Sequence, residues 1–293
     1  MVSHNLVPAG IALFTSVLVP ISFVIFVDCT KKFAASKLIR KKHGKDENDE
    51  NDYVKTLEFE MKEKQSYREA ELKFFLPYSL IYLLALILIF LIVGPFINFN
   101  IMEIYFSSKF NKTVKEKFFG TLTILIINFV LYSGLLIQFF MGIEELCPKT
   151  IFCTFMENIY GPFLEEFIYR GLLFTLLRHA GYGGIKSSIY SSLTFSLSHF
   201  RHIFDIYFTK NMIPHLFFQS FYTLLFGFYT CYAYNYSGTI FAPILLHGVC
   251  NKLQMPRFNY LNDPNISQFK KNLISFTYIF GILGWIILIK IYH

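Results

Sequence analysis

Residues 74–97 read FFLPYSLIYLLALILIFLIVGPFI and contain no charged side chain. The hydrocarbon core of a bilayer is about 30 Å thick, so a helix needs roughly 20 consecutive apolar residues to cross it. This block is long enough to do so. Similar blocks occupy residues 6–27, 118–141 and 273–292. All four predict membrane-spanning helices.

The composition extends this prediction to the whole chain. Of 293 residues, 54% are hydrophobic and 36 are phenylalanine, which is more apolar surface than a water-soluble domain of this length can bury. Apolar stretches interrupted by Gly, Pro, His and Glu lie at 152–178, 187–206, 212–235 and 238–254. We therefore predict an all-α polytopic membrane protein with about eight transmembrane helices.

Residues 31–73 form a charged insert within what is otherwise a single membrane domain, residues 1–293. The stretch 31–45 holds seven Lys or Arg and no acidic residue, so the positive-inside tendency places the insert in the cytosol, where it would be drawn to anionic lipid. Residues 53–73 predict a surface helix, and the acidic run 46–52 predicts a disordered loop tip. Nucleic acid is not an expected partner, because no basic stripe is interleaved with aromatic residues on a soluble domain.

Ionisable side chains within apolar helices cost about 2.5–3.5 kcal/mol each on insertion scales, and they usually face a bundle interior or a wet cavity. The first such cluster is Glu165, Glu166 and Arg170. Glu166 and Arg170 are spaced i, i+4 and can pair, which leaves Glu165 pointing about 100° away, into the bundle. A desolvated carboxylate holds a proton more tightly, as a general base working near neutral pH requires. The alternative is a charge cluster at a helix end near the headgroups.

The second cluster is Phe195 and His199, which fall on one helical face, with His202 one turn further on. A single histidine in an apolar helix is more often a satisfied structural residue than a catalytic one. His202 is either an accessory residue or lies at the membrane interface.

The third cluster is His247 and Asn251, spaced i, i+4 on one face, with Gly248 beside them. Two hydrogen-bond donors held side by side can stabilise a developing oxyanion, and each is worth roughly 3–4 kcal/mol in a dry, pre-aligned site. Gly248 would let another helix or a substrate backbone approach. The alternative is a polar contact that holds two helices together.

Together the three clusters resemble a known family. Glu165-Glu166…Arg170, Phe195…His199 and His247…Asn251 are similar to the EExxxR, FxxxH and HxxxN motifs of the type II CAAX prenyl endopeptidases. These enzymes are the eukaryotic branch of the CAAX-protease and bacteriocin-processing (Abi) family. The resemblance covers about 150–260, which we take as the catalytic helices.

The resemblance implies an intramembrane catalytic cavity in the endoplasmic reticulum membrane, accessible from the cytosol. There, an endopeptidase would remove the C-terminal aaX tripeptide from prenylated CAAX proteins such as small GTPases. Glu165 and His199 would activate a water, while His247 and Asn251 would stabilise the tetrahedral oxyanion. Supporting residues would be Glu166, Arg170, Phe195 and His202, with Glu166 and Arg170 orienting their helix or binding the tail carboxylate.

Alternatives to this assignment concern the cofactor and the function. Glu165, His199 and His247 also match the His₂Glu set of catalytic zinc sites, but no HExxH is present and the resemblance favours metal-free catalysis, so we expect no cofactor. Other possible functions are a non-catalytic membrane scaffold, a transporter, or a family protease that acts on unprenylated substrates. Transporters often contain repeats, and none is found in this sequence.

Overall fold

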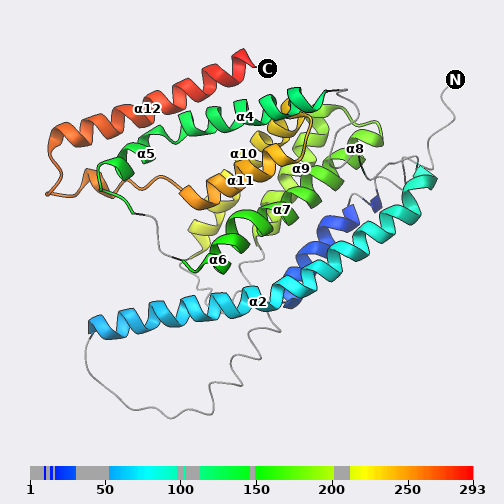
Figure 1. The fold of residues 1–293 in the computed structure, drawn as a ribbon, viewed down its shortest axis with the longest axis horizontal. Helices are drawn as coiled ribbons and strands as arrows, with labels where there is room; N and C mark the ends of the chain where they lie inside the picture. The colour runs from blue at the N-terminus through cyan, green and yellow to red at the C-terminus, as the bar shows by residue number, and fades with distance from the viewer. Residues whose placement is uncertain are drawn as a thin grey trace, which may run out of the picture.

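The computed structural model describes residues 10, 14–15, 17–30, 53–97, 102, 112–145, 149–200 and 212–292. The regular elements within these ranges are helices, so the predicted all-α class is confirmed (Figure 1). After a helix at Val17–Thr30, the elements are α2 (Tyr53–Val93), η1 (Gly94–Ile97), α4 (Val114–Leu131), α5 (Ser133–Phe140), α6 (Ile151–Phe155), η3 (Met156–Tyr160), α7 (Gly161–Glu166), η4 (Phe167–Phe174), α8 (Thr175–His179), α9 (Gly184–Ser198), α10 (Ile213–Ser237), α11 (Phe241–Leu253), η7 (Asn259–Leu261) and α12 (Gln268–Ile291).

Two of the described helices are long and apolar enough to cross a membrane: Arg68–Val93 within α2, and α12. The pair α4 and α5 adds a third if the two helices, bent by 66°, count as one span. Large apolar side chains such as Leu84 and Phe280 are exposed on these helices, as expected for surfaces that face lipid. The described residues thus contain two or three such spans, and the total of eight stays a prediction.

No break in the helix separates the end of the charged insert from the apolar block that follows it. Residues 53–73 and 74–93 form one continuous helix, α2, rather than a surface helix followed by a separate span (Figure 1). Pro77 lies inside this helix and cannot donate to the carbonyl of Lys73, yet the helix continues past it. The predicted loop tip at 46–52 lies outside the described residues.

The predicted span at 118–141 is broken near Tyr132, where α12 packs against it. A Cβ added to Gly134 would lie 2.4 Å from the Tyr278 ring, and one added to Gly281 would lie 2.5 Å from the Ser133 hydroxyl. The Ser133 hydroxyl also donates to the carbonyl of Thr277 at 3.0 Å. The bend therefore coincides with a close approach between α5 and α12 that only small residues allow.

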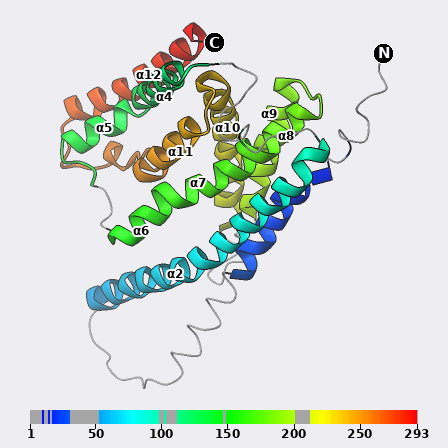
Figure 2. The same cartoon turned by 45° about the vertical axis from the view of Figure 1, so that its right-hand side comes forward.

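Residues 151–179, comprising α6, η3, α7, η4 and α8, form one continuous helix that we call the central helix. The Val17–Thr30 helix and α2 lie on one side of it, whereas α10 and α11, and beyond them α4, α5 and α12, lie on the other (Figures 1 and 2). All eight residues of η4 are buried. The central helix is the part of the fold that carries the predicted glutamates.

Candidate active site

The central helix departs from α-helical geometry on both sides of Glu165 and Glu166. The segments η3 and η4 are π-helical, and α7, which holds both glutamates, lies between them. Such π-helical turns leave backbone groups with altered partners and frequently occur at functional sites. The glutamates therefore lie on a short α-helical turn between two irregular segments.

The docking of α11 on the central helix follows from Pro162. Proline has no amide N–H, so the carbonyls of Asn158 and Glu157 lose the donor that an α-helix or a π-helix would provide. Helix α11 covers both carbonyls. The Asn251 side-chain amide donates to the carbonyl of Glu157 at 2.9 Å, and a Cβ added to Gly248 would lie only 2.1 Å from the carbonyl oxygen of Asn158. The close helix approach predicted at Gly248 is present.

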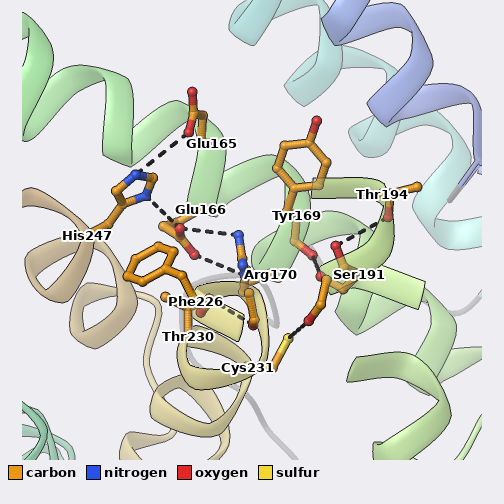
Figure 3. A network of polar contacts seen from close by, with 12 residues as sticks. Glu165, Glu166, Tyr169, Arg170, Ser191, Thr194, Phe226, Thr230, Cys231 and His247 are labelled. Atoms are coloured by element: carbon orange, nitrogen blue, oxygen red, sulfur yellow. Dashed lines mark hydrogen bonds and ion pairs between the residues drawn. The ribbon is translucent and has the colours of Figure 1, made fainter. Parts of the chain in front are cut away.

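A buried network of charges lies beneath this contact. Glu166 and Arg170 have no exposed side-chain surface, and their charged groups are joined at 3.2 Å by the Oε2–Nε and Oε1–Nη1 contacts (Figure 3). The ion pair predicted from their spacing is therefore present. Oε1 of Glu166 also lies 2.8 Å from Nδ1 of His247. Buried charges need such partners, because an unpaired one would be strongly destabilising.

Phe195 forms an apolar support for the network. The Arg170 guanidinium lies over the Phe195 ring, 4.4 Å from its centroid, in a cation–π arrangement. The same ring contacts two imidazoles edge-on, with centroid distances of 4.9 Å to His199 and 6.0 Å to His247. Phe195 thus joins the second motif to the first and third.

Glu165 and Glu166 share His247. Oε2 of Glu165 is 3.8 Å from Nε2 of His247, which is longer than a hydrogen bond, and the Glu165 side chain is 23% exposed. In Figure 3 contacts run from His247 to both carboxylates, with one ring nitrogen facing each. Nδ1 is held by the buried Glu166, which fixes the direction of Nε2 toward Glu165.

A cavity of about 280 Å³ lies beside Glu165. Glu165 and Asn251 both line it, together with apolar residues of the Val17–Thr30 helix and α2. Three further charged residues line it that the sequence analysis did not select: Arg68, Glu71 and Glu157. One available signal was Glu157, a third carboxylate in the apolar stretch that contains Glu165.

The contacts that link His199 to the other candidate catalytic residues run through Phe195. It follows the last residue of α9, and its Nδ1 lies 2.9 Å from the carbonyl of Phe195. The structure brings Glu165, His247 and Asn251 to one side of the central helix, and His199 joins them through Phe195. His202 lies outside the described residues.

The zinc alternative receives no support from side-chain positions. In the described parts of the chain, no group of three or more His, Cys, Asp or Glu side chains is arranged to hold a metal ion. The predicted set of Glu165, His199 and His247 is therefore not assembled as a metal site. Metal-free catalysis stays a prediction.

Residues 147–253 match the family described as type II CAAX prenyl endopeptidase Rce1-like. The resemblance to this family is confirmed. The Rce1-like segment contains every candidate catalytic residue, whereas Arg68 and Glu71 lie outside it. Together with the apolar spans of α2 and α12, the match makes the chain a helical membrane protein.

Three curated relatives share the name CAAX prenyl protease 2. The protein from Arabidopsis thaliana is 28% identical over 138 residues, which cover 45% of this chain and 41% of that protein. The Caenorhabditis elegans protein is 30% identical over 125 residues, covering 41% and 46%, and the Homo sapiens protein is 28% identical over 106 residues, covering 34% and 32%. The match thus spans less than half the length of each relative. No solved structure matches the chain.

Proposed function

We propose that this chain is an intramembrane endopeptidase that removes the C-terminal aaX tripeptide from prenylated CAAX proteins. The observation that carries the proposal is that Glu165 and Asn251 line one cavity and that His247 lies beside Glu165, all three within the Rce1-like segment. The name of the curated relatives, CAAX prenyl protease 2, supports the substrate class.

In the proposed reaction Glu165 is the general base. It takes a proton from a water whose oxygen attacks the carbonyl carbon of the prenylated cysteine. When the C–N bond breaks, Glu165 returns that proton to the leaving amine, so atoms and charges balance. His199 is proposed to assist Glu165 at the water, as the family resemblance implies. The partial exposure of Glu165 at the cavity supports this role, because the base must reach both water and substrate.

His247 and Asn251 are proposed to stabilise the oxyanion. An asparagine amide has two N–H donors, and Asn251 uses one on the carbonyl of Glu157, which leaves the second for substrate. The Nε2 atom of His247 faces Glu165 at the cavity and can donate when the ring carries both protons. The contact between Nδ1 and Glu166 holds the ring in this orientation before substrate binds.

Glu166 and Arg170 then have an orienting role. The sequence left two roles open for them, orienting the helix or binding the tail carboxylate. Both side chains are fully buried and paired with each other, and the Arg170 guanidinium is covered by Phe195. This arrangement supports the first role, because Arg170 has no exposed surface to offer a substrate.

The membrane setting suits a prenylated substrate. The cavity wall contains the apolar side chains of Phe23, Val27, Leu72 and Phe75, and a prenyl chain lying between helices would bring the scissile bond to this depth. We propose about eight spans in the endoplasmic reticulum membrane, with the catalytic helices at 150–260. We propose that the Arg68 end of α2, and with it the cavity, faces the cytosol; the basic residues at 31–45 support this orientation.

The test of this function uses the full chain in proteoliposomes. Two peptides of identical CAAX sequence, one farnesylated and one not, are incubated with the protein, and released tripeptide is measured by mass spectrometry. We expect release from the farnesylated peptide alone, unchanged by a membrane-permeant chelator. Equal release from both peptides would show a protease that does not require the lipid. Release from neither would contradict the proposed function, and loss of activity in the chelator would contradict metal-free catalysis.

A further inference from the structure

Arg68 is the only cation among the described residues that line the cavity beside Glu165. It belongs to α2, outside the Rce1-like segment, and its side chain is 44% exposed. Because Arg68 lies on the wall of the same cavity as Glu165, its guanidinium can contact a substrate bound there.

Two carboxylates hold Arg68 in place. Its Nη1 donates to Glu71 at 2.9 Å and its Nε donates to Glu157 at 3.2 Å. Glu157 is also paired with Lys149 at 2.5 Å, so the two acids are balanced by two cations. Within the described part of the chain, Nη2 of Arg68 has no hydrogen-bond partner. Two of the three guanidinium nitrogens are therefore held by carboxylates, and Nη2 is left to donate to a ligand.

A fixed guanidinium with free donors is suited to a carboxylate. Arg binds carboxylates with two parallel hydrogen bonds, and the geometry of its planar fork selects for that group. Lys149 does not line this cavity, and the Arg170 guanidinium is fully buried. Arg68 is thus the cation that a substrate carboxylate in this cavity would reach.

The proposed reaction supplies such a carboxylate. An aaX tail carries it three residues beyond the scissile bond, which is at most about 10 Å of extended chain. The cavity, at about 280 Å³, lies near the lower end of the range of small-ligand sites, and it has Glu165 and Arg68 on its walls. We propose that Arg68 binds the C-terminal carboxylate of the aaX tail and thereby sets the length of the released peptide. This inference rests on the proposed function.

The effect of this contact is expected to be moderate. A hydrogen bond to a charged group is worth about 1.5–3 kcal/mol, or roughly 10- to 150-fold in affinity. Because the Arg68 side chain is 44% exposed, solvent weakens the contact, and we use the lower end of this range of affinities. We expect about a tenfold effect, found mainly in KM.

The experiment compares two farnesylated peptides that differ only at the C-terminus, one ending in a carboxylate and the other in a carboxamide. The wild-type protein should cleave the acid with a KM about tenfold lower than that of the amide. In Arg68→Gln the KM for the acid should rise to the KM for the amide, while turnover of the amide stays unchanged. Arg68→Lys, which keeps the charge without the fork, should be intermediate. The matched control is Lys73→Gln, which removes an exposed cation from the same helix, where Lys73 pairs with Glu69.

The outcomes separate this inference from the function on which it rests. Equal cleavage of acid and amide by the wild type overturns the role of Arg68 and leaves the protease intact, whereas cleavage of neither overturns the proposed function. An equal loss on both peptides in Arg68→Gln would instead assign Arg68 to positioning Glu157 and Asn251. If Arg68→Gln does not fold, inhibition of the wild type by the free tripeptide acid and its amide gives the same comparison, and equal inhibition overturns the proposal.

Discussion

Replacing Gly248 with alanine tests how closely α11 must dock on the central helix. A Cβ at this position would lie 2.1 Å from the carbonyl oxygen of Asn158, well inside the 3.0 Å below which real Cβ contacts essentially never occur. The obstacle is the backbone of the π-helical segment η3, so α11 must move by about 1 Å. Asn251 and His247 lie on the same helix and would move with it. Misplacement of catalytic groups by 1 Å can cost about 100-fold in rate, and overpacking costs about 1–3 kcal/mol of stability.

We therefore expect Gly248→Ala to lower kcat on a farnesylated CAAX peptide by about 100-fold, with a small decrease in Tm. Activity is measured by tripeptide release, and unfolding by a thermal shift assay in detergent. The matched control is Gly184→Ala, where the added Cβ would meet only the end of the Arg178 side chain at an ordinary 3.5 Å. A Gly248→Ala protein with wild-type kcat and Tm would refute the reasoning, because α11 could not then be as close to Asn158 as the structure has it.

Two further predictions concern the buried network. Arg170→Met should destabilise the protein by about 3–5 kcal/mol, because it leaves the fully buried Glu166 carboxylate without its cation. Adding Glu166→Gln to this variant should restore part of the Tm. A wild-type Tm in Arg170→Met would show that the ion pair does not stabilise the fold. Glu166→Gln alone should reduce kcat less than Glu165→Gln does, because Glu166 acts through His247 rather than on the water. An equal loss in the two variants would mean that the glutamates share the role of base.

Much of the fold could be predicted from the sequence because apolar blocks and helical periodicity are local signals. The predicted spans correspond to helices wherever the structure describes them, and the Glu166–Arg170 pair follows from i, i+4 spacing alone. The helix predicted at 53–73 is present but continues into the apolar block, because a change from charged to apolar side chains does not by itself interrupt a helix. The break near Tyr132 lies within an apolar run and depends on packing against α12, which the sequence does not display.

The site was predictable as a set of residues but not as a set of contacts. That His247 lies between both glutamates depends on how α11 docks, which is decided by Pro162 and Gly248 acting together across two helices. Arg68 was not selected because charges near the end of an apolar block are also what a membrane interface requires. Only the tertiary contact with Glu157, 89 residues away in the chain, places Arg68 beside Glu165.

Glu165→Gln is the most direct test of the role given to the cavity carboxylate. The substitution keeps the shape of the side chain and removes its capacity to accept a proton, and general-base catalysis contributes about 10²–10⁴ in rate. Tripeptide release from a farnesylated CAAX peptide is compared with that of the wild type and of Glu69→Gln, the same change at a site paired with Lys73 on α2. We predict a loss of at least about 100-fold in Glu165→Gln, with an unchanged Tm and with Glu69→Gln fully active. Wild-type release by a folded Glu165→Gln protein would contradict the account.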